Sequence, residues 1–171
     1  VIGGSNFIFQ HVYKNYDEYF KNKNRKFMVI YRGINTGYYS QKNIVQTKLE
    51  QIVKEWNVDK SKFIILLPGR LTPWKGQEIF IEALSILNNQ NDVKPFFSII
   101  LGGDQGRKVY SKKLESLAER YRLNNKLIFI PKCDDMPIAY QISDVVVSSS
   151  IEPEAFGRVS VEAQSMERPV I

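Results

Sequence analysis

The 171-residue sequence predicts an α/β fold in which helices cover both faces of a parallel sheet. Short apolar runs alternate along the chain with longer segments whose apolar residues recur at helical spacing, as in strands joined by helical crossovers. Most of these runs are continuously apolar, which is typical of strands buried on both faces. The chain is 43% hydrophobic and 25% charged. This composition is that of an ordinary globular domain with a substantial core.

Six apolar runs of four to six residues, or shorter at the chain end, predict the strands. They are Phe27–Tyr31, Phe63–Leu67, Phe97–Leu101, Leu127–Ile130, Asp144–Val147 and Pro169–Ile171. In a parallel sheet the carboxyl ends of the strands meet at one edge, where loops enter the helices and ligands bind.

The segments between these runs predict helices. We expect Ser5 to cap the first, and Asp134 or Asp135 to cap the fifth. The expected helices run from Ser5 to about Tyr13, from about Val45 to Trp56, from near Gly76 through Leu87, and over Lys108–Tyr121, Met136–Ser143 and Arg158–Met166.

The net charge of +6 comes from basic residues spread along the chain, with Lys about twice as common as Arg. We interpret it as general surface charge, with peripheral membrane association as an alternative, and expect no nucleic-acid binding. No apolar run is long enough to span a membrane. A single Cys133 and a single His11 make a disulfide or a zinc site unexpected. A reducing, cytoplasmic compartment is therefore expected.

Both chain ends suggest a piece of a longer protein. The sequence begins at Val1 without an initiator Met and stops within the apolar run Pro169-Val170-Ile171. Domain boundaries usually fall in polar linkers. We therefore expect further sequence on both sides.

The loop after the strand Phe63–Leu67 carries two cations, Arg70 and Lys75. Arg presents a planar fork to phosphate oxygens, and Lys presents a mobile point charge. The pattern favours a phosphate clamp, with a solvated surface loop as the alternative. The next strand ends in a glycine-rich turn beginning at Gly102, which is explained either by a tight turn or by close approach to a ligand.

An acidic loop follows the strand Asp144–Val147 and enters a helix at Arg158. It carries Glu154, then Phe156-Gly157, and the helix carries Glu162. N–H groups at a helix start bind anions, and carboxylates accept hydrogen bonds from hydroxyls, so this pattern predicts a ligand with both an anion and a diol. The close acidic pairs Glu152 with Glu154 and Asp134 with Asp135 do not form a metal-ligating pattern, so we expect no metal site.

Taken in order, these motifs resemble the C-terminal, donor-binding domain of retaining family 4 glycosyltransferases of the two-domain GT-B architecture. The motifs are Gly69-Arg70 with Lys75-Gly76, the turn at Gly102–Gly106, Glu154 and Glu162 with seven residues between them that include Phe156-Gly157, and Pro169-Val170-Ile171. The resemblance spans essentially the whole chain and implies a Rossmann-like sheet. It also implies that residues 1–35 link this domain to an N-terminal acceptor domain that the sequence lacks.

The resemblance implies that Arg70 and Lys75 hold the diphosphate of a nucleotide-sugar and that Glu154 meets hydroxyls of the transferred sugar. Glu162 would bind the ribose, with an ordinary ion pair to Arg158 as the alternative, because the two are four apart on one helix. Donor contacts are also expected from Phe156, Gly157, Arg158, Gly102 and Lys132, the last beside the base.

The implied reaction is retaining transfer of a sugar from a nucleotide-diphosphate sugar to a saccharide or lipid-linked acceptor, without metal or cofactor, in surface polysaccharide or lipopolysaccharide synthesis. A non-catalytic nucleotide-binding remnant and an epimerase of similar architecture are the alternatives. One departure from the family pattern is Glu167, which stands where a left-handed glycine is usual after the helix.

Overall fold

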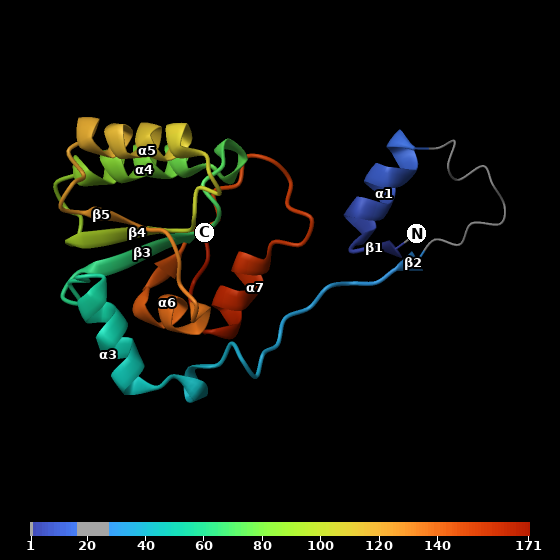
Figure 1. Cartoon of the computed structure of the whole chain (residues 1–171), viewed down its shortest axis with the longest axis horizontal. Helices are drawn as coiled ribbons and strands as arrows, with labels where there is room; N and C mark the ends of the chain where they lie inside the picture. The colour runs from blue at the N-terminus through green and yellow to red at the C-terminus, as the bar shows by residue number, and fades with distance from the viewer. Residues whose placement is uncertain (1, 17–27) are drawn as a thin grey trace.

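The computed structural model describes residues 2–16 and 28–171. Its first part is a small unit in which β1 (Ile2–Gly3) and β2 (Met28–Val29) pair in parallel around α1 (Asn6–Asn15). Ser5 caps α1 as expected, because its Oγ accepts the Ile8 N–H at 3.2 Å. This unit lies apart from the main sheet, joined to it by an extended segment (Figure 1). The Phe27 end of the expected first strand lies outside the described residues.

The main sheet is parallel throughout, with strand order β5-β4-β3-β6. Its strands are β3 (Phe63–Pro68), β4 (Phe96–Leu101), β5 (Leu127–Ile130) and β6 (Val145–Val146). A parallel bridge from Val146 to Val170 adds the start of another strand beyond β6. The expected strand Pro169–Ile171 is thus present as this single bridge.

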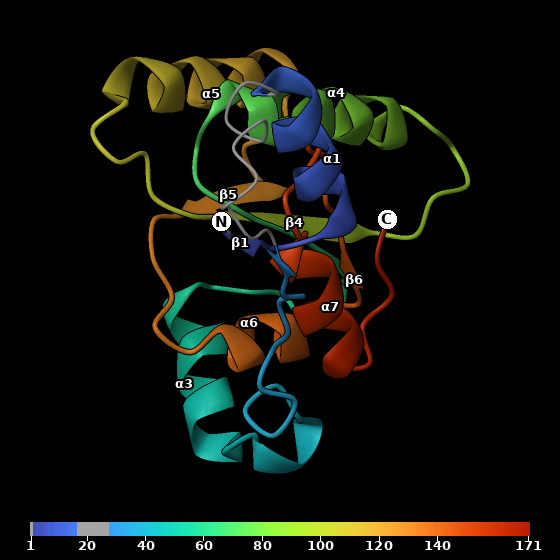
Figure 2. The same ribbon diagram turned by 90° about the vertical axis from the view of Figure 1, so that its right-hand side faces the viewer.

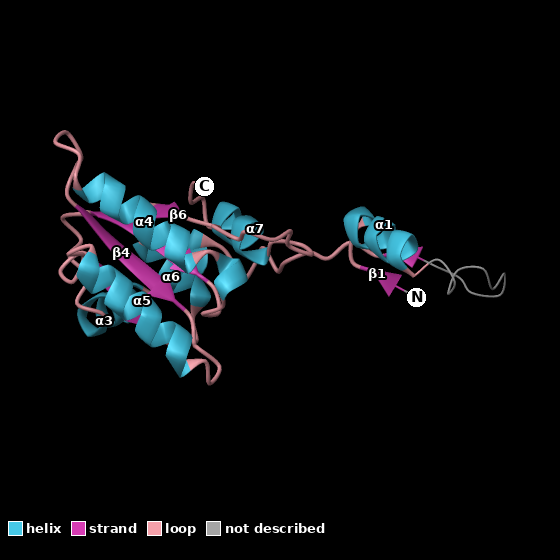
Figure 3. Cartoon of the chain, turned by 90° about the horizontal axis from the view of Figure 1, so that it is seen from above, coloured by secondary structure: helices cyan, strands magenta, loops and turns pink. Residues whose placement is uncertain are grey.

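Helices cover both faces of the sheet, as the sequence predicts. The pair α4 (Gln77–Asn88) and α5 (Lys108–Arg120) lies side by side on one face (Figures 1 and 3). The opposite face carries α3 (Gln46–Glu55), α6 (Met136–Ile142) and α7 (Arg158–Ser165) (Figure 2). Two short 3-10 turns, η1 (Gln41–Asn43) and η2 (Pro73–Lys75), precede α3 and α4.

Strand β3 shows why its apolar run is continuous. Ile64 and Leu66 pack into the core beneath α3 and α6, whereas Ile65 and Leu67 pack into the core beneath α4 and α5. All four are buried. Successive side chains of a strand point to opposite faces, so a strand between two helical layers needs apolar residues at every position.

The strand order creates a switch point between β3 and β6. The chain runs outward from β3 through β4 to β5, then returns to place β6 on the other side of β3. Loops at the carboxyl ends of such neighbouring strands diverge, and this divergence opens a crevice for ligands. The loops after β3 and β6 are the two that carry the predicted cations and carboxylates.

Glu167, just after α7, adopts the left-handed conformation expected at this position, with a φ of +57°. The Arg168 N–H donates to the Ala163 carbonyl at 2.9 Å, and the Glu167 N–H donates to the Gln164 carbonyl at 2.9 Å. This pair of bonds is a Schellman motif, which usually places glycine at the left-handed position. The backbone therefore adopts the left-handed conformation that glycine usually takes, despite the unfavourable residue.

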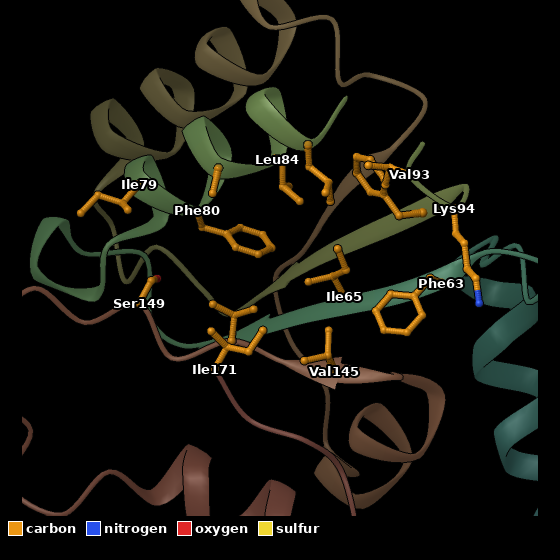
Figure 4. Close-up of a pocket in the computed structure, with 14 residues that line it drawn as sticks. Phe63, Ile65, Ile79, Phe80, Leu84, Val93, Lys94, Val145, Ser149 and Ile171 are labelled. Atoms are coloured by element: carbon orange, nitrogen blue, oxygen red, sulfur yellow. The ribbon is translucent and has the colours of Figure 1, made fainter. Parts of the chain in front are cut away.

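An apolar groove of about 560 Å³ lies on the α4 face and reaches Ser149, in the loop after β6 (Figure 4). Phe80 and Leu84 of α4 form one wall, and Ile65, Val145 and Ile171 form the floor. Among the described residues, no helix has both the length and the apolar character needed to cross a membrane.

Candidate functional site

A cleft of about 380 Å³ opens at the carboxyl ends of β3, β4 and β5, beside the start of α7. It brings together five residues that the sequence singled out: Arg70, Gly102, Lys132, Arg158 and Glu162. Its remaining lining residues are Tyr39, Pro68, Gly69, Leu101, Pro131, Cys133, Met136, Tyr140 and Val159.

Glu162 is a buried carboxylate in this cleft, with only 5% of its surface exposed. Its Oε1 accepts from Arg158 Nε at 2.9 Å and from the second guanidinium nitrogen at 2.7 Å. Its Oε2 accepts the hydroxyl of Tyr140 at 2.8 Å. The structure thus shows the Arg158 ion pair that was the alternative for Glu162. A carboxylate has about four acceptor sites, so the three bonds leave room for a ligand hydroxyl.

Two tyrosines that the sequence reading missed surround Glu162. Tyr140 is fully buried, and Tyr39 packs against its ring edge-on, with centroids 6.1 Å apart. Burial, reinforced by the Glu162 charge, raises the pKa of Tyr39 to about 12 and raises that of Tyr140 as well. Both hydroxyls therefore stay protonated and can donate to the carboxylate at any physiological pH.

Arg158 reaches the same carboxylate from the solvent side, with 65% of its side chain exposed. The hydrogen bonds from its guanidinium to Glu162 raise its pKa further, so it is a permanent cation. Because it is held only at this end, the guanidinium can also turn toward an anionic ligand in the cleft.

Two further residues that the sequence singled out, Lys75 and Glu154, are in direct contact although 79 residues separate them, a pairing that the sequence did not predict. Glu154 Oε1 accepts from Lys75 Nζ and also from Ser150 Oγ, the latter at 2.6 Å. The ammonium lies 4.4 Å from the centroid of the Trp74 ring. Burial alone raises the pKa of Glu154, but the bonds from Lys75 and Ser150, with the charge of Arg70, hold it below its ordinary value.

Backbone contacts fasten the loops after β3 and β6 together around this ion pair. Ser149 Oγ donates to the carbonyls of Lys75 and Gly76, and the Ile151 N–H donates to the Trp74 carbonyl at 2.8 Å. Gly76 has a φ of +71°, and a Cβ there would lie 1.9 Å from the Ser149 carbonyl oxygen. Only glycine fits where these two loops cross.

The backbone of Arg70 is held in a similar way. Its carbonyl accepts from Nε2 of Gln77, a fully buried residue of α4, at 2.7 Å. A Cβ on Gly102 would lie 2.1 Å from the Gly69 carbonyl oxygen, so the loops after β3 and β4 also touch. Gly102 therefore serves loop packing and lines the cleft at once. Gln77 is a positioning residue that the sequence reading did not identify.

Gly157 begins α7 with a φ of +71°. No described side chain caps this helix, so the N–H groups of its first turn remain available at the mouth of the cleft. The preceding Phe156 is partly buried in the loop, and neither Phe156 nor Gly157 is among the cleft-lining residues.

At the far rim, Lys132 is exposed and pairs with Asp134 at 2.6 Å, which raises the lysine pKa. The next residue, Asp135, occupies the cap position of α6, but its side chain makes no capping bond there. It accepts instead from Lys48 of α3 at 2.5 Å. The expected cap is thus an interhelical ion pair. Among residues 2–16 and 28–171, no three His, Cys, Asp or Glu side chains cluster in a way that could hold a metal.

Comparison with known proteins places this geometry in a family. The family described as "Glycosyl transferases group 1" matches residues 49–171. Spore coat protein SA of Bacillus subtilis is 31% identical over 159 residues, which are 89% of this chain and 41% of that protein. A D-inositol 3-phosphate glycosyltransferase of Jonesia denitrificans is 31% identical over 111 residues, 63% of this chain and 26% of that protein.

Solved structures extend the likeness to nearly the whole chain. A glycosyltransferase from Rickettsia africae is 35% identical with a TM-score of 0.87, covering 99% of this chain and 43% of that one. Anabaena Alr3699/HepE, solved in complex with UDP-glucose, is 28% identical with a TM-score of 0.77 over the same shares. The chain therefore spans less than half the length of these relatives.

Proposed function

The chain belongs to the glycosyl transferases group 1 family, and we propose that it is the donor-binding part of a glycosyltransferase that uses a nucleotide-diphosphate sugar. The observation that carries this proposal is the convergence of three cations, Arg70, Lys132 and Arg158, with Glu162 on one cleft. A nucleotide-sugar presents the complementary groups, a diphosphate and a ribose diol. The Anabaena relative, solved with UDP-glucose, makes uridine the first base to test.

Each side chain has a role that its position supports. Arg70 and Lys75 hold the diphosphate, with the N–H groups of α7 directed at the same anion. Glu162 binds a ribose hydroxyl through the acceptor site that Tyr140 and Arg158 leave free. The base lies against Pro131, Lys132 and Cys133 at the far rim of the cleft.

The chemical step follows from this placement. As the bond between the anomeric carbon and the phosphate breaks, negative charge grows on the leaving diphosphate, and pre-placed cations stabilise it. Arg70 and Lys75 supply the positive charge that stabilises the leaving diphosphate. The proposed reaction therefore needs neither a divalent metal nor a cofactor. The leaving phosphate takes the proton of the acceptor hydroxyl on the same face of the sugar, which leads to retention. Glu154 contacts sugar hydroxyls and is not assigned as a nucleophile.

We also propose that residues 1–35 link this domain to an N-terminal acceptor-binding domain. The separate β1-α1-β2 unit exposes Phe7, Tyr16 and Tyr31 to about half or more of their surface, as an element does when its partner lies elsewhere. Transfer needs both halves to position donor and acceptor, so the 171-residue chain should bind donor weakly and transfer nothing. The acceptor is proposed to be a saccharide or lipid-linked saccharide of surface polysaccharide or lipopolysaccharide synthesis, met in the cytoplasm or at the membrane surface.

Titration calorimetry on the 171-residue chain with UDP, GDP and ADP tests this function. We expect one nucleotide to bind in the presence of EDTA and to bind at least about tenfold more weakly to Lys75→Ala, because a charge-assisted contact is lost. Lys54→Ala, which removes an exposed lysine of α3, is the matched control and should leave the affinity for the nucleotide unchanged. If no diphosphate binds the folded chain, or if EDTA abolishes binding, the proposal is wrong.

A further inference from the structure

We propose that Glu154 discriminates the sugar-bearing donor from the nucleoside diphosphate left after transfer, by occupying Lys75 whenever the sugar is absent. This inference rests on the proposed function. The observation behind it is that Lys75, which would hold the diphosphate, is paired with an anionic side chain, Glu154.

The contact between Lys75 and Glu154 is partly buried and is supported by neighbouring side chains, unlike an ion pair on the open surface. The side chains of Lys75 and Glu154 are only 15% and 27% exposed. Ser150 donates to the same carboxylate oxygen as Lys75, and the Trp74 ring covers the ammonium. The Ser149 hydroxyl donates to the Lys75 carbonyl and the Ile151 N–H donates to the Trp74 carbonyl, and these bonds fix the two loops that carry the pair. Glu154 thus stands where a phosphate oxygen would otherwise meet the ammonium.

A phosphate that reaches Lys75 must share it with this carboxylate or displace it. The charge of Arg70 also acts on Glu154, so the carboxylate lies within electrostatic reach of both cations of the clamp. Its negative charge therefore opposes any anion bound there. The opposition grows with the charge of the incoming phosphate.

The donor and the product differ in that charge. The terminal phosphate of a free nucleoside diphosphate carries about −1.5 to −2 near neutral pH. The same phosphate esterified to a sugar has lost its second ionisable oxygen and carries a single charge. The sugar also brings hydroxyls that can donate to Glu154 when Lys75 turns to the phosphate. Glu154 should therefore weaken binding of the nucleoside diphosphate more than binding of the nucleotide-sugar. This difference favours release of the diphosphate after transfer.

Calorimetric titration of UDP and UDP-glucose into the 171-residue chain and two variants tests this. Glu154→Gln removes the charge while keeping the shape, and Glu152→Gln removes an equal charge from an exposed residue of the same loop. We expect Glu154→Gln to bind UDP about 5- to 10-fold more tightly, a typical coupling between sites, and UDP-glucose no more tightly than the wild type. Glu152→Gln should change neither affinity by more than about twofold.

Equal effects of the two variants on UDP, or weaker UDP binding by Glu154→Gln, would overturn the inference and leave the proposed function standing. If the wild type binds neither ligand, GDP with GDP-mannose and ADP with ADP-glucose are titrated in their place. Failure of all three pairs overturns the proposed function, and this inference with it. Circular dichroism verifies the fold of each variant, and Glu154→Ala, which is also uncharged, should reproduce the tighter diphosphate binding.

Discussion

Replacing Tyr140 by phenylalanine removes one buried hydroxyl and leaves the rest of the side chain in place. The hydroxyl donates to Glu162 Oε2 at 2.8 Å, and neither residue is more than 5% exposed. A hydrogen bond to a charged group contributes about 1.5–3 kcal/mol, and the abandoned oxygen cannot reach bulk water. Arg158 still holds Oε1. We therefore expect the free energy of unfolding to fall by about 1.5–3 kcal/mol, a decrease of roughly 3–12 °C in Tm for a chain of this size.

Urea unfolding followed by circular dichroism measures this loss. Tyr110→Phe is the matched control, because the Tyr110 side chain is only partly buried, its hydroxyl donates to Gln77 Oε1 at a longer 3.4 Å, and the nearby Glu78 carboxylate is itself partly exposed. Water can replace the lost bond there, so the change should alter stability by less than about 1 kcal/mol. In a Glu162→Gln background, the effect of Tyr140→Phe should shrink by about 1 kcal/mol, since the two residues are coupled. Equal effects of the Tyr140 and Tyr110 changes, or strict additivity in the cycle, would refute a charge-assisted bond at this site.

Three further predictions concern the backbone and the ion pair. Glu167→Gly should raise the free energy of unfolding by about 1 kcal/mol in urea titrations, because φ is +57° there, and the same change at Asn57 (φ +52°) should yield less, since asparagine tolerates this conformation. Gly76→Ala should lower the free energy of unfolding by at least about 2 kcal/mol. Gly157→Ala, at the same φ but with no atom within 4 Å of the position that a Cβ would take, should lower it by only about 1 kcal/mol. Similar losses for the two variants would show that the crossing of the two loops at Gly76 does not exclude a side chain. The pKa of Glu154 lies below its ordinary value of 4.5. Its ionised carboxylate therefore contributes fully to stability above pH 4.5, and this contribution is lost as the pH falls through the lower pKa of the folded state. In acid unfolding experiments, Lys75→Ala should lack this pH-dependent loss of stability.

Most elements of the fold could be predicted because their signals are local. The run Leu127–Ile130 is a strand with the predicted bounds, and β3 and β4 differ from prediction by one residue each. β3 and β4 are buried between helices, and the edge strand β5 is partly buried, so the apolar run of each marks its strand to within one residue. The last strand is reduced to the Val170 bridge, which depends on pairing with β6 and not on its own residues.

The site was only partly predictable, for a physical reason that separates its two ion pairs. Arg158 and Glu162 are four apart on one helix, so their contact follows from helical periodicity. Lys75 and Glu154 are 79 residues apart, and only the placement of β6 beside β3 brings them together. Tyr140 reads as an ordinary core aromatic in an apolar helix, because nothing local reveals that its hydroxyl meets a buried carboxylate.

The central claim, that the cleft between β3 and α7 binds a nucleoside diphosphate, is tested most directly by mapping amide chemical shifts of the 15N-labelled chain during a UDP-glucose titration. We expect saturable shifts at Gly69, Gly102 and Arg158, which lie at the ends of β3 and β4 and at the start of α7. The groove lined by Phe80 and Leu84 should stay unperturbed. Shifts confined to that groove or to α1, with the cleft silent, would contradict the donor site proposed for this chain.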